Sequence, residues 1–141
     1  DGGRPGTPVG AWVKMEITCP NSNSPTIKRW DSGDNMDNDN HRFIVPEEGL
    51  YSFTFMVTYN TQNAGHRVFG EIRVNDDSDN AWRVIAVAGG SSQRLTASKT
   101  MLLNLSVNDY VELWGQQETG FPQDARAGET YLAGFKFAGE L

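Results

Sequence analysis

One stretch of nine residues, 51–59, alternates apolar and polar side chains with a period of two. One side of this stretch carries Tyr51, Phe53, Phe55, Val57 and Tyr59, and the other side carries Ser52, Thr54 and Thr58, with Met56 as its one apolar member. Successive side chains of a strand point to opposite faces of a sheet, so this spacing predicts a strand with one buried face. A half-buried strand so rich in aromatic residues is typical of the centre of an antiparallel sandwich.

Shorter segments of similar character fill most of the remaining chain. We expect strands at 11–18, 26–30, 43–45, 67–75, 82–88, 95–105, 110–115 and 131–137. The inward side chains are predicted to be Val68, Ile72, Val74, Met101, Leu103, Leu105, Val111 and Leu113. The polar segments 31–40 and 116–129 are predicted to be loops. About eight to ten strands with no helical period indicate an all-β, antiparallel sandwich or jelly roll.

Charge and composition exclude several classes of function. The 141 residues include 12 basic and 18 acidic side chains, a net charge of −6, whereas binding to a phosphate backbone requires a basic face. No apolar run approaches the ~20 residues of a membrane span. Nucleic-acid binding and membrane insertion are therefore not expected. Cys19 is the single cysteine, so stability must come from the core, from subunit contacts or from both.

The first ten residues differ from the rest of the chain. Gly3-Arg4-Pro5 and Gly6-Thr7-Pro8 are two Gly-X-Y triplets, the spacing of a collagen triple helix, and Val9 breaks the frame. The triplets are either the end of a collagen-like stalk or an ordinary Pro/Gly linker. We therefore divide the chain into a linker or stalk end at 1–10 and a jelly-roll domain at 11–141.

Three segments carry motifs that can be compared with those of a known family. Residues 43–53 contain an aromatic residue, a proline and then Gly-x-Tyr-x-Phe. Residues 103–113 contain two spaced leucines, a tight turn and a Val-x-Leu strand, and residues 132–137 read Leu-Ala-Gly-Phe-Lys-Phe. In this order and spacing they resemble the globular head of complement C1q, which shares its jelly roll with tumour necrosis factor. Asn108 stands at the usual turn glycine of that family, and Lys136 stands where an apolar residue is usual.

The resemblance implies a trimer, often at the end of a collagen-like stalk, in an extracellular or surface-exposed setting. Four aromatic residues lie out of phase with the predicted core and are candidates for the trimer interface: Trp12, Trp30, Tyr110 and Trp114. The alternative is that they are single surface aromatics.

Residues with catalytic or metal-binding chemistry are few. His41 and His66 have no ligand-like spacing, and the chain has no Gly-x-Ser-x-Gly elbow, so we expect no enzyme. Two acidic loops remain, one with Asp31, Asp34, Asp37 and Asp39, the other with Asp76, Asp77 and Asp79. The second loop is a candidate calcium site, because Ca²⁺ prefers clustered carboxylates on flexible loops. The alternative is a solvated acidic turn.

Two functional hypotheses follow from these features. The first is a trimeric recognition or adhesion head that binds a surface glycan or protein multivalently, either at a phage or bacterial fibre tip or in a secreted defence protein. The second is a structural module that registers three chains and binds no ligand. A receptor-binding cytokine of the tumour necrosis factor type is less favoured, because the N-terminus resembles a stalk.

Overall fold

The structure of the protein is a computed structural model that describes residues 9–17, 33–91 and 93–139. These residues form nine strands and one 3₁₀ turn. The elements are β1 (Val13–Lys14), β2 (Met36–Asp37), β3 (Arg42–Ile44), β4 (Gly49–Thr61), β5 (Arg67–Val74), β6 (Trp82–Val87), β7 (Gln93–Leu105), β8 (Tyr110–Glu118), η1 (Ala127–Glu129) and β9 (Tyr131–Ala138). The prediction of an all-β antiparallel sandwich is confirmed.

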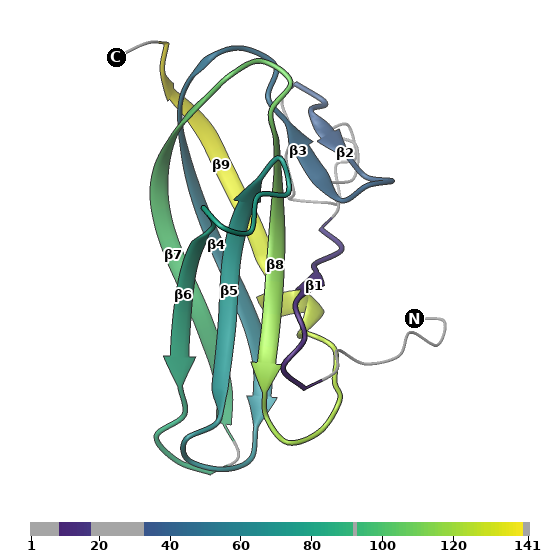
Figure 1. The fold of residues 1–141 in the computed structure, drawn as a ribbon, viewed down its shortest axis with the longest axis vertical. Helices are drawn as coiled ribbons and strands as arrows, with labels where there is room; N and C mark the ends of the chain where they lie inside the picture. Colours follow the sequence, from purple (N-terminus) through teal and green to yellow (C-terminus); the bar gives the residue numbers. More distant parts are fainter. Residues whose placement is uncertain (1–8, 18–32, 92, 140–141) are drawn as a thin grey trace.

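The strands form two sheets that lie face to face. The larger sheet has the order β2-β3-β8-β5-β6, with β1 also paired to β8, and the smaller sheet has the order β7-β4-β9. Figure 1 shows β6, β5 and β8 in front of β7, β4 and β9, with the long strands following the long axis of the molecule. Strand β4 is the central strand of its sheet, as the alternation of 51–59 predicts.

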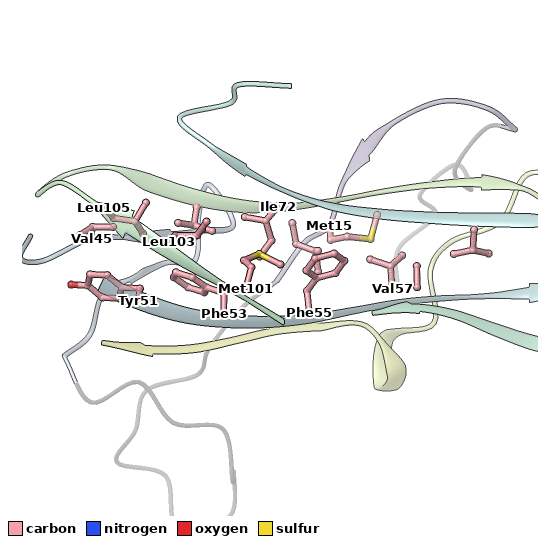
Figure 2. Packing of buried hydrophobic residues seen from close by; sticks show 14 of the residues in the cluster. Met15, Val45, Tyr51, Phe53, Phe55, Val57, Ile72, Met101, Leu103 and Leu105 are labelled. Atoms are coloured by element: carbon pink, nitrogen blue, oxygen red, sulfur yellow. The ribbon is translucent and has the colours of Figure 1, made fainter. Parts of the chain in front are cut away.

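The core lies between the two sheets. Phe55, Val57 and Tyr59 are completely buried, and the predicted inward side chains of β5, β7 and β8 are also buried, except for the half-buried Val74. Figure 2 shows the β4 side chains pointing toward Met15 and Ile72 of the facing layer. Truncating one such aromatic side chain to alanine typically costs about 3–5 kcal/mol.

Gly49, in the Gly-x-Tyr-x-Phe segment, has a packing role. A Cβ atom at this position would lie 2.6 Å from the carbonyl oxygen of Ala138 and 2.7 Å from that of Gly139. Real Cβ atoms do not approach backbone oxygens so closely. The end of β9 can therefore approach the start of β4 only because residue 49 has no side chain.

The predicted strand 11–18 is shorter than expected. Only Val13–Lys14 form strand β1, and Thr18 lies outside the described residues. The amide of Met15 still donates to the carbonyl of Leu113 at 2.8 Å, but the amide of Ile17 donates to the carbonyl of Met15 at 2.9 Å. This local turn leads the chain away from β8 and ends the pairing.

The prediction that 31–40 is entirely loop is wrong. Met36–Asp37 form β2, in which Met36 pairs with Phe43 and Asp37 pairs with Arg42. The carboxylate of Asp37 accepts hydrogen bonds from the amide of Asn40 at 3.1 Å and from its side chain at 2.8 Å. These bonds close a turn that brings the two short strands together.

The predicted loop 116–129 also begins as a strand, since β8 continues to Glu118. Gln117 is completely buried although it is polar. Its Oε1 accepts hydrogen bonds from the amide of Thr119 at 2.8 Å and from the hydroxyl of Thr119 at 2.6 Å, and its Nε2 donates to the carbonyl of Phe121 at 3.0 Å. A buried amide with its partners in place does not oppose folding.

Candidate functional site

The outer face of the larger sheet contains a buried carboxylate. Glu71 is completely buried, and its two oxygens each lie 2.7 Å from an arginine, Arg73 on one side and Arg83 on the other. Strand register produces this cluster, because Glu71 pairs with Arg83 on β6 and Arg73 follows two residues later on the same face of β5. Both oxygens have a cationic partner, which a buried carboxylate requires.

Two of the predicted interface residues cover these arginines. The Arg73 guanidinium carbon lies 3.9 Å from the centre of the Trp114 ring and 5.8 Å from that of Trp12. The Arg83 guanidinium carbon lies 4.8 Å from the centre of the Trp12 ring, and Trp12 meets Phe69 edge to face at 6.0 Å. Cations of the same chain thus contact the faces of both indoles.

Tyr110, the first residue of β8, has a similar environment. The Arg42 guanidinium carbon lies 4.5 Å from the centre of its ring, and the Arg42 Nε lies 3.3 Å from a carboxylate oxygen of Asp37. Trp12, Tyr110 and Trp114 are all half-buried, and Trp30 lies outside the described residues. The assignment of these four residues to a trimer interface stays a prediction.

The outer face of the smaller sheet presents apolar side chains directly to solvent. Ser52, on the outer side of β4, pairs with Leu102 of β7 and with Phe135 of β9, so these two side chains lie in one row across the sheet. Their exposed fractions are 55% and 63%, and Tyr131, four residues before Phe135 on the same face, is 42% exposed. We call Leu102, Tyr131 and Phe135 the apolar patch.

Sequence reasoning missed the apolar patch. Segment 131–137 has apolar residues in both phases of its alternation, so its outer face could not be recognised. Leu102 offered one signal, because it lies between the inward Met101 and Leu103. Its exposure depends on pairing with the polar side of the central strand, and that pairing is a property of the register.

Two of the three carboxylates in the loop predicted to bind calcium, those of Asp76 and Asp77, make other contacts. Asp76 lies 3.4 Å from Arg73, and Asp77 accepts hydrogen bonds from the amides of Asp79 at 3.0 Å and Asn80 at 3.2 Å. In the part of the chain that the structure describes, no group of three or more His, Cys, Asp or Glu side chains could hold a metal ion. The calcium site stays a prediction that these contacts do not favour.

A small hollow borders this turn between β5 and β6. It has a volume of about 220 Å³ and is lined by Val74, Asn75, Asp77, Asn80 and Trp82. The side-chain amide of Asn80 donates to Asp77 at 2.7 Å, and this bond, as the largest cause, lowers the pKa of the Asp77 carboxyl below its usual 3.8. We call this feature the β5–β6 hollow.

The two histidines contact backbone atoms. His41 Nδ1 lies 3.1 Å from the carbonyl oxygen of Ile17, and His66 Nδ1 accepts a hydrogen bond from the amide of Gln62 at 3.4 Å. The structure places neither of them in the β5–β6 hollow. No helix within residues 9–17, 33–91 and 93–139 is long and apolar enough to cross a membrane.

Comparisons with known proteins identify the fold. No protein-family description and no curated protein matches the chain. Among solved structures, the globular domain of the zebrafish complement 1qA protein aligns with a TM-score of 0.54 and 18% identity, over 88% of this chain and 90% of that one. The Eiger TNF of S. frugiperda aligns with a TM-score of 0.53 and 9% identity, over 96% of this chain and 90% of that one. The chain has a C1q/TNF-like jelly-roll fold. At these identities the likeness concerns the fold alone.

Proposed function

We propose that this domain is a non-enzymatic, trimeric recognition head that is displayed outside the cell and binds a surface glycan or protein. The observation that carries the proposal is the apolar patch of Leu102, Tyr131 and Phe135 on the outer face of the smaller sheet. The C1q/TNF-like fold supports the same assignment, because the resembled family assembles as trimers.

The apolar patch favours self-association. Burying exposed apolar area gains roughly 25 cal/mol per Å², so a face with three such side chains is stabilised when a second copy covers it. The acidic chain, with its net charge of −6, gives no electrostatic attraction between copies, so the attraction must be mainly apolar. The triplets at 3–8 would place three chains side by side if they end a collagen-like stalk.

Three copies would strengthen a weak binding site. When several sites on one assembly meet a surface with repeated ligands, the second and third contacts form at a high effective concentration. A shallow site on each protomer is then sufficient for firm attachment. This suits a head whose hydrogen-bonding groups lie in turns at the ends of strands, as those of the β5–β6 hollow do.

Light scattering on the purified domain tests the trimer. We expect a mass three times that of the 15.6 kDa chain at micromolar concentration. A mass equal to one chain would overturn the trimer. The trimer should then bind at least one ligand in a screen of surface glycans and cell-surface proteins. An intact trimer that binds nothing would favour a structural module that registers three chains.

A further inference from the structure

The β5–β6 hollow combines an apolar wall with a polar rim. Val74 and Trp82 form the wall, and both pack against the core on their other side. Asn75, Asp77 and Asn80 form the rim. The hollow lies where the turn joins β5 to the edge strand β6 (Figure 1), so it is at the margin of the larger sheet.

We infer that this hollow binds one pyranose ring of a glycan, an inference that rests on the proposed recognition function. A pyranose has a face of C–H groups and a rim of hydroxyls. The face of an indole carries the negative part of its quadrupole and attracts polarised C–H groups, which suits the wall at Trp82. Hydroxyls are both donors and acceptors, and carboxylate and carboxamide groups meet both needs.

The rim has hydrogen-bonding capacity left for a ligand. The Asp77 carboxylate accepts three hydrogen bonds, from the amides of Asp79 and Asn80 and from the Asn80 side chain, whereas a carboxylate offers about four acceptor positions. The Asn80 side chain uses one of its two N–H groups in the bond to Asp77. A charged acceptor and an amide donor therefore lie side by side, and hydrogen bonds to a charged carboxylate are the stronger kind.

The rim is held in place before any ligand arrives. Asn75 and Asp76 have φ angles of 55° and 59°, and the amide of Asp77 donates to the carbonyl of Val74 at 3.1 Å, which makes a tight β-turn at the start of the connection from β5 to β6. The Asn75 side chain also donates to Asp109 at 2.9 Å and accepts from the amide of Tyr110 at 3.0 Å. These bonds join the β5–β6 turn to the turn that precedes β8. Few additional side chains would therefore have to become ordered when a ligand binds.

The size and charge of the hollow narrow the class of ligand. A volume of about 220 Å³ is below the roughly 300–1,000 Å³ of sites for larger small molecules, so it suits a single ring. Asp77 on the rim disfavours anionic sugars. A neutral hexose or N-acetylhexosamine fits these constraints.

A second turn provides a matched control. Asn40 donates to Asp37 through its amide at 3.1 Å and its side chain at 2.8 Å, and Asn80 makes the same two bonds to Asp77 at 3.2 and 2.7 Å. Two residues after Asn40 the chain has Arg42, whereas two residues after Asn80 it has Trp82. Substituting either asparagine by alanine removes the same side-chain hydrogen bond and keeps the backbone one, but only Asn80 lines the hollow.

The experiment measures binding of methyl pyranosides of glucose, galactose, mannose, N-acetylglucosamine and N-acetylgalactosamine to the full chain by NMR. We expect millimolar binding of at least one of them, about tenfold weaker in Asn80→Ala and unchanged in Asn40→Ala. Trp82→Phe should weaken binding less than Asn80→Ala, because it keeps an aromatic face. NMR spectra of each variant report whether it is folded.

The outcomes separate this inference from the proposed function. Pyranoside binding that Asn80→Ala and Trp82→Phe leave unchanged would overturn the inference while recognition stands. If none of the five pyranosides binds but another ligand binds in the surface screen, the inference about the hollow is also overturned while the proposed recognition function stands. A folded trimer that binds no ligand in either experiment would overturn the proposed function as well.

Discussion

The two sheets have outer faces of opposite character. On the larger sheet, Glu71 is buried between Arg73 and Arg83, and Trp12 covers both arginines. On the smaller sheet, Leu102, Tyr131 and Phe135 are exposed; the first and last pair with Ser52 of β4, and Tyr131 pairs with Met56. Trp12 and Trp114, which the sequence marks as candidates for the trimer interface, already have partners within their own chain. The difference teaches that an aromatic residue indicates an interface only when its own chain leaves it uncovered.

The largest effect is expected from the charge cluster of the larger sheet. Glu71→Ala should lower the free energy of unfolding by about 3–5 kcal/mol, because it leaves the buried Arg73 without its main anionic partner. The control Glu118→Ala removes the exposed ion pair with Arg67 and should cost about 0.2–1 kcal/mol. Urea denaturation measures both. Equal losses would show that the cluster is an ordinary surface network.

The next effect concerns the apolar patch. The double substitution Leu102→Ser and Phe135→Ser should dissociate the proposed trimer into folded protomers, because each side chain contributes about 1.5–3 kcal/mol when buried. Light scattering measures the mass. Ile85→Ser with Val87→Ser is the matched control, since these residues are 49% and 59% exposed on the larger sheet. If only the control variant dissociated, the trimer interface would lie on the larger sheet instead.

A substitution of Trp12 distinguishes between two trimer interfaces, one at the apolar patch and one at the aromatic residues that the sequence predicts. Trp12→Ala should destabilise the fold by about 1–2 kcal/mol through the lost contacts with Arg73, Arg83 and Phe69, and should leave the trimer mass unchanged. Thermal unfolding and light scattering on the same sample measure both quantities. Loss of the trimer in a folded Trp12→Ala variant would instead support the interface that the sequence predicts.

The smallest effect concerns two turns at the rim of the larger sheet. Hydrogen bonds from Asn40 and Asn80 hold the pKa values of Asp37 and Asp77 below the usual 3.8. Folding thus favours the charged carboxylates, so their contribution to stability is present above pH 3.8 and is lost as the pH falls through the lowered pKa. NMR titration should show that Asn80→Ala raises the pKa of Asp77 alone. If the pKa of Asp37 also changed in this variant, the two turns would be coupled.

Sequence reasoning succeeded where one local rule was sufficient. The alternation of 51–59 identified the buried face of β4, because a period of two has only one arrangement on a pleated sheet. It failed at Met36 and Gln117, which lie in strands although their neighbours are polar. Gln117 is buried because Thr119 and Phe121 satisfy its amide, and no local pattern contains that information.

The β5–β6 hollow, too, could not be predicted from local sequence patterns. The sequence marked 76–79 as an acidic turn and a calcium candidate, but it could not place Trp82 beside that turn. Side-chain direction at the end of a hairpin depends on the turn type, here set by the positive φ angles of Asn75 and Asp76. The combination of an apolar wall and a polar rim in the hollow could therefore be recognised only in the structure.

The sequence by itself determined which residues face inward on β4, β5, β7 and β8, up to residue 115, and with them the sandwich, because burial in these strands follows the alternation of each strand separately. The tertiary structure decided which side chains are exposed on the outer faces of the two sheets and which are covered. The register of β4 placed Leu102 and Phe135 on either side of Ser52, and the antiparallel pairing of β1 with β8 brought Trp12 to Arg73. Exposure on the outside depends on neighbours from distant parts of the chain, and those neighbours are set only when the strands pair.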